Sequence, residues 1–173
     1  MLGTLFFMVG AAGCLVPPDI AYEAPPAPQP PRIEGSKGLS PDPSAGPIYL
    51  SKIGPSGERC GPQPILATVV DPDSTRVYWR IFFDYYHDDA QEPDTGDAEA
   101  EPGTEIAVNF NVDPNDARFG SESVPHQVEL LVADQPFYDD QREPRGRAVP
   151  DGDLTDSMIW TVVLTQGAQC GSR

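Results

Sequence analysis

The chain has 173 residues, of which 39% are hydrophobic, and a formal net charge of −16. A surface of that charge repels phosphate backbones, which argues against nucleic acid as a partner. The 21 prolines exceed the usual share, and ten of them lie in residues 15–47. The composition therefore predicts one folded domain, preceded by a segment that cannot build a core.

Residues 1–13 are an apolar run without a charged side chain. The run is shorter than the roughly 20 residues that a membrane-spanning helix needs, and its length is typical of a signal peptide. Its last residues lead into a cysteine as Ala11-Ala12-Gly13-Cys14. This stretch resembles the lipobox of bacterial lipoproteins.

The lipobox resemblance implies that the signal peptide 1–13 is removed and that Cys14 receives the lipid. It places the protein in the cell envelope, joined to the membrane through its N-terminal lipid. Leu15 after the cysteine favours the outer membrane in a host with two membranes. Several acyl chains together anchor stably where one chain binds reversibly. The alternative is a plain secretory signal, which leaves Cys14 as an unexplained thiol.

Residues 14–47 are predicted to be the lipidated cysteine and a disordered, proline-rich tether. Few apolar side chains are available there to offset the entropy of ordering the chain. Clustered prolines favour an extended polyproline II conformation. We therefore expect a spacer between the membrane and the folded domain.

Residues 48–173 are predicted to form an all-β domain. Alternating or β-rich segments bounded by Gly, Pro or Asp predict six strands at Ile48–Ile53, Ile65–Val70, Arg76–Tyr86, Glu105–Val112, Gln127–Ala133 and Met158–Thr165. The clearest alternation places Ile106, Val108, Phe110 and Val112 on one face. A period of two with one apolar face is typical of a two-sheet sandwich. A further short strand is expected near residues 115–125.

The stretches ATVVDPDSTRVYWRIF (67–82) and VELLVADQ (128–135) resemble bacterial immunoglobulin-like, PKD and cadherin-like domains. The resemblance implies an immunoglobulin-like sandwich in which Trp79 is the buried tryptophan of its strand. In that topology the second strand begins, and the last strand ends, at the same end of the sandwich. Cys60 precedes one and Cys170 follows the other, so the resemblance implies a Cys60–Cys170 disulfide, which an exported compartment permits.

The same resemblance suggests a calcium site formed by Asp71, Asp73 and Asp134, because cadherin-like domains bind calcium at that end of the sandwich. Carboxylate oxygens are the ligands that Ca²⁺ prefers. The alternative is ordinary turn chemistry, since Asp-Pro-Asp-Ser favours a turn without a metal. No other cofactor is expected.

Two long loops are predicted. Residues 88–102 carry seven carboxylates and no basic residue, which predicts a mobile, solvated loop. Residues 138–157 contain Arg142, Arg145 and Arg147, a basic group that could dock on an acidic loop or an anionic glycan. A surface loop without a special role is the alternative.

Catalytic motifs are missing from the sequence, whose only histidines are His87 and His126. We therefore expect a non-catalytic envelope protein whose immunoglobulin-like domain mediates interaction or assembly with a protein or glycan partner. The alternative is a calcium-stabilised adhesion or carbohydrate-binding module, and a hydrolase is the third possibility.

Overall fold

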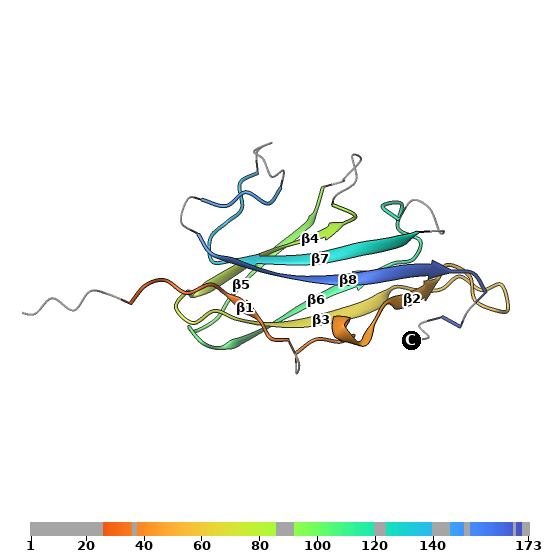
Figure 1. Cartoon of the computed structure of the whole chain (residues 1–173), viewed down its shortest axis with the longest axis horizontal. Coiled ribbons are helices and arrows are strands. Elements are labelled where there is room, and N and C mark those ends of the chain that lie inside the picture. Colours follow the sequence, from red (N-terminus) through yellow and green to blue (C-terminus); the bar gives the residue numbers. More distant parts are fainter. Residues whose placement is uncertain are drawn as a thin grey trace, which may run out of the picture.

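The computed structural model describes residues 26–35, 38–85, 92–119, 124–139, 146–150, 153–167 and 169–170, and shows two packed β-sheets (Figure 1). The strands of this part of the chain are β1 (Arg32–Ile33), β2 (Ile48–Ser51), β3 (Gln63–Val70), β4 (Arg76–Phe83), β5 (Asp94–Glu99), β6 (Glu105–Val112), β7 (Pro125–Ala133) and β8 (Thr155–Thr165). A 3₁₀ turn, η1 (Pro43–Ala45), precedes β2. No helix in the described ranges is long and apolar enough to span a membrane. Cys14 and His87 lie outside these ranges.

One sheet has three strands in the order β1-β3-β6, and the other has five in the order β2-β8-β7-β4-β5. All pairs are antiparallel except β2 with β8. The main core fills the space between the sheets and draws apolar side chains from both. The predicted all-β, two-sheet sandwich is thereby confirmed.

The six predicted strands are all present, as β2, β3, β4, β6, β7 and β8. In β6 the exposed and buried residues alternate without exception, as expected for a strand with one face on the core. In β7, by contrast, every residue from Val128 to Ala133 is buried. Both faces of β7 are covered, because a second apolar cluster lies on the outer face of the five-stranded sheet.

The tryptophan that is completely buried in the core is Trp160 on β8, not Trp79 as the family resemblance implied. The Trp79 side chain packs against the core but is only partly buried. Its indole lies against Gly96 on the neighbouring β5, where a Cβ atom would come within 2.6 Å of the ring. Glycine at position 96, which has no Cβ atom, therefore leaves the space that the Trp79 indole occupies at the edge of the sheet.

The prediction that residues 88–102 form one mobile loop is wrong for residues 94–99, which form β5 and pair with β4. The carboxylates of β5 meet basic side chains that the sequence pattern alone does not place. Arg76 of β4 forms ion pairs with Asp97 and Glu99, and Arg118 forms a two-bond ion pair with Asp94. These contacts reduce the self-repulsion that argued against a strand.

Residues 31–47 were predicted to belong to the disordered tether, but in the structure residues 31–35 and 38–47 pack along the sandwich (Figure 1). Ile33 is buried in the core, and its backbone N–H donates to the Asp156 carboxylate at 2.8 Å. The Trp160 indole N–H donates to the carbonyl of Pro41 at 2.8 Å. The folded domain therefore begins before residue 48, because a few apolar side chains and carbonyls in the proline-rich segment meet partners in the core.

The described part of residues 115–125 contains turns, with no strand before β7 begins at Pro125. Side chains favour the turns, because Asp116 accepts from the Arg118 backbone N–H at 2.8 Å. The Arg118 guanidinium lies 3.8 Å from the centre of the Phe83 ring and hydrogen-bonds Asp116, which lowers the pKa of that carboxyl below its ordinary value. The extra strand expected here is therefore not found in the described residues.

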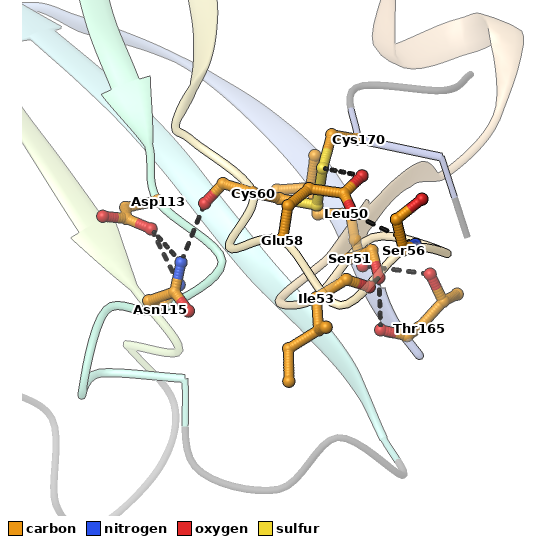
Figure 2. The surroundings of a disulfide bond; sticks show 10 residues. All are labelled: Leu50, Ser51, Ile53, Ser56, Glu58, Cys60, Asp113, Asn115, Thr165 and Cys170. Atoms are coloured by element: carbon orange, nitrogen blue, oxygen red, sulfur yellow. Dashed lines mark hydrogen bonds between the residues drawn. A yellow bond between two sulfur atoms is a disulfide. The ribbon is translucent and has the colours of Figure 1, made fainter. Parts of the chain in front are cut away.

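A disulfide joins Cys60 to Cys170 (Figure 2). It lies at the end of the sandwich opposite β1, because Cys60 precedes β3 whereas β1 pairs with the last residues of β3. Cys60 is buried, and its carbonyl accepts from the Asn115 side-chain amide at 3.0 Å. The bridge ties the start of β3 to the segment after β8, across a sequence separation of 110 residues. The predicted pairing is thus present in the structure.

Replacing both cysteines, as Cys60→Ala with Cys170→Ala, should lower the free energy of unfolding. A loop of this length predicts a loss of about 4–5 kcal/mol, because the unfolded chain regains the freedom that the bridge removes. Urea denaturation of both proteins under oxidising conditions measures the difference. Equal denaturation midpoints would show that the bridge does not stabilise the domain.

Candidate binding site

The carboxylates predicted to bind calcium lie near the end of the sandwich where β3 ends and β4 begins. Asp71 follows β3, Asp73 lies in the next turn and Asp134 follows β7. In the described ranges no three His, Cys, Asp or Glu side chains are close enough to hold one metal ion. The calcium site therefore stays a prediction. Its three residues lie near the same end of the sandwich but do not form one cluster.

Asp71 is nevertheless an unusual carboxylate. It is 2% exposed, and one oxygen accepts from the backbone N–H groups of Asp73 and Ser74 at 3.1 and 2.8 Å. Its other oxygen is buried without a hydrogen-bond partner among the described residues. Burial raises the pKa of the Asp71 carboxyl, and the Asp73 charge adds to this, although the two backbone hydrogen bonds lower it.

Asp153, in the connection between β7 and β8, has a similar carboxylate. One of its oxygens is buried with no hydrogen-bond partner in the described part of the chain. Burial and the nearby charge of Asp134 both raise the pKa of the Asp153 carboxyl. Asp134 thus has Asp153 as an acidic neighbour, and Asp71 has Asp73.

His126 lies at the opposite end of the sandwich and is buried, with 2% of its surface exposed. Its Nδ1 is 2.6 Å from a carboxylate oxygen of Asp84, and its ring contacts Phe119 edge-on. The other oxygen of Asp84 accepts from the Gln127 backbone N–H at 2.7 Å. The His126–Asp84 pair therefore joins the end of β4 to the start of β7.

The outer face of the five-stranded sheet carries a cluster of arginine, aromatic and carboxylate side chains. Arg80 of β4 points to this face, with 8% of its side chain exposed. Its guanidinium donates to the carbonyls of Tyr138 and Gly146 at 3.1 and 2.7 Å and to the Asp139 carboxylate at 2.8 Å. It also lies 4.9 Å from the centre of the Phe137 ring. One buried cation therefore holds the connection between β7 and β8 on the sheet.

A second arginine fixes the same connection. Arg147 forms a two-bond ion pair with Glu129 of β7, whose side chain is 5% exposed. The Arg147 guanidinium also lies over the rings of Phe82 and Tyr85. Of the three arginines predicted to form a basic group, Arg147 is thus held inside the domain. Arg142 and Arg145 lie outside the described residues.

Between this connection and the edge strand β5 lies a hollow of about 190 Å³. Its lining residues include the aromatic residues Tyr78 and Phe137, together with Thr95, Asp97 and Asp139. Alternation in β4 indicates that Tyr78 faces outward. Thr95 and Asp97 could not be found from the sequence, because β5 was predicted to be a loop.

The hollow is smaller than the roughly 300–1,000 Å³ of sites that enclose a whole small molecule. It suits one protruding group of a larger partner, such as a sugar ring or a side chain. Aromatic rings offer flat apolar surfaces, and carboxylates accept hydrogen bonds from hydroxyl or ammonium groups. The hollow beside β5 is therefore suited to binding one group of a larger partner molecule.

A second hollow, of about 210 Å³, adjoins the disulfide and is lined in part by Leu50, Ser51, Pro62 and Pro114. None of its lining residues carries a charged side chain. It offers less basis for selecting a ligand than the hollow beside β5.

No known protein family matches the sequence, and no curated protein matches it.

Replacing Arg80 by methionine should loosen the β7–β8 connection, because two carbonyls and a carboxylate lose their donor while the apolar volume is kept. We expect a loss of about 2–4 kcal/mol in the free energy of unfolding, and faster hydrogen exchange at Tyr138 and Gly146. Arg76→Met is the matched control. It removes exposed ion pairs from the same strand and should cost at most about 1 kcal/mol. Equal losses in the two variants would contradict the role assigned to Arg80.

Proposed function

We propose that this protein is a non-catalytic, lipid-anchored protein of the cell envelope whose immunoglobulin-like domain binds a protein or glycan partner. The observation that carries the binding role is the outer face of the five-stranded sheet. There Arg80 and Arg147 hold a long connection in place and so form a hollow with aromatic and carboxylate groups. Binding surfaces of sandwich domains are commonly built from such connections.

The strand order supports the immunoglobulin-like assignment. The central strands β8-β7-β4-β5 correspond to the order G-F-C-C′ of variable-type immunoglobulin domains, and β3 with β6 corresponds to B with E. The N-terminal segment divides between the sheets, since β1 pairs with β3 and β2 pairs in parallel with β8. This order is only one criterion, and the fold by itself selects no function.

The anchoring role is supported by the sequence before residue 26 and by the direction in which the chain enters the domain. The N-terminal segment leaves the sandwich at the β1 end, away from the disulfide (Figure 1). Because the Gln29 backbone N–H already donates to the Asp73 carboxylate at 2.9 Å, residues 14–28 remain as the proposed spacer. In polyproline II they would span about 50 Å.

The experiment that tests anchoring compares the wild type with Cys14→Ser after expression in a bacterial host. We expect the wild type to fractionate with membranes and to carry acyl mass on an N-terminal fragment that begins at Cys14. The variant should show neither property. Release of both proteins in soluble, unmodified form would overturn the lipid anchor.

A second candidate is a calcium-stabilised adhesion or carbohydrate-binding module. It is favoured by the buried oxygen of Asp71 that lacks a hydrogen-bond partner among the described residues. If calcium binds there, adding it should raise the melting temperature, since a ligand that binds only the folded state stabilises it. Asp71→Asn keeps an oxygen for the turn hydrogen bonds and should abolish the calcium effect. Glu58→Gln, at the opposite end, is the control. An unchanged melting temperature of the wild type in calcium would reject this candidate.

A further inference from the structure

Strand β6 ends the three-stranded sheet, and no described strand pairs with its other side. It spans eight residues, from Glu105 to Val112. The described residues between β6 and Pro125 form turns and add no strand beside it. An edge of this length offers backbone donors and acceptors to another strand.

The hydrogen bonds of β3 show which groups of β6 face the free side. Leu66 of β3 exchanges two backbone hydrogen bonds with Ser40, each 2.9 Å long, so its backbone groups point away from β6. Its neighbour Ala67, opposite Val108, must then point its backbone groups toward β6. Because the direction alternates along a strand, the backbone N–H and C=O groups of Ala107 and Asn109 point to the free edge.

The other sheet edges carry features that hinder pairing. β1 has two residues and follows Pro30 and Pro31, and β2 has four residues. β5 carries Asp94, Asp97 and Glu99. In contrast, β6 contains no proline and only one charged residue, Glu105 at its start. Charge, proline and short length are the usual means of blocking an edge, and β6 lacks them.

The outer surface beside this edge is also uncharged over most of its length. It is formed by Pro64, Leu66 and Thr68 of β3 and by Ala107, Asn109 and Asn111 of β6, of which all but Thr68 are exposed. On a chain with a net charge of −16, such a surface is where two copies can approach with the least repulsion.

We propose that β6 pairs with β6 of a second copy of this chain, antiparallel across a two-fold axis at Val108. This register places Ala107 opposite Asn109 of the other copy, and Glu105 opposite Asn111. Apolar residues then face the core side in both copies, and no two like charges lie opposite each other. The four outward-directed residues, Glu105, Ala107, Asn109 and Asn111, form about eight backbone hydrogen bonds between the copies. The two three-stranded sheets become one six-stranded sheet.

Sedimentation of the full chain with Cys14→Ser tests the dimer without any contribution from acyl chains. We expect a concentration-dependent shift from monomer to dimer over an approximately hundredfold range. Asn109→Pro removes a donor that faces the free edge and none that faces β3. It should weaken the dimer by about tenfold or more, since both copies lose a hydrogen bond and are bent at the edge. Asn109→Ala keeps the donor and should dimerise like the parent.

If Asn109→Pro melts at a much lower temperature, Asn109→Glu replaces it, because that variant keeps the backbone donor but places a carboxylate near Glu105 of the other copy. A parent that stays monomeric throughout the range overturns the proposal. So does a dimer that survives both Asn109→Pro and Asn109→Glu. Neither result bears on the lipid anchor, because the parent of this series lacks the acyl acceptor.

Discussion

The indole of Trp160 sits between the two sheets with no exposed surface, and its N–H needs an acceptor there. The carbonyl of Pro41 supplies it at 2.8 Å. That hydrogen bond, together with the pairing of β1 with β3, holds the proline-rich N-terminal segment along the sandwich. The segment then covers the edge of β3 through Ser40 and Leu66. With β3 covered on one side and paired with β6 on the other, β6 becomes the outer edge of its sheet.

The alternation of apolar residues was sufficient to predict the strands with one face on the core. β6 is the clearest example, since its predicted and observed limits coincide. β5 could not be predicted this way, because Asp94, Gly96 and Asp97 are individually unfavourable in strands. Its pairing depends on Arg76 and Arg118, which come from elsewhere in the chain, and on an indole that occupies the space above a glycine. Such partners become visible only when distant segments are placed together.

The disulfide could be predicted from the sequence, whereas the candidate binding site could not. The positions of Cys60 and Cys170 at strand ends made their pairing predictable from the expected topology, and the structure contains it. The hollow beside β5 depends on which side chains a long connection brings over the sheet. The alternation of β4 places Arg80 on the outer face, opposite Val77, Ile81 and Phe83 of the core. That it is buried and donates to Tyr138, Asp139 and Gly146 follows from the path of the connection, which carries no periodic pattern.

The Cys60–Cys170 bridge also determines whether the fragments of a proteolysed chain stay joined. Proteases cut folded domains preferentially in exposed loops. One cut anywhere between Cys60 and Cys170 gives two fragments that remain covalently joined through the bridge. A domain nicked in any of its later loops would thus be retained with its N-terminal segment instead of being shed, and only a cut before Cys60 would release it. For the lipid-anchored protein proposed above, the stretch between Cys14 and Cys60 is therefore the part of the chain whose integrity decides whether the domain stays attached.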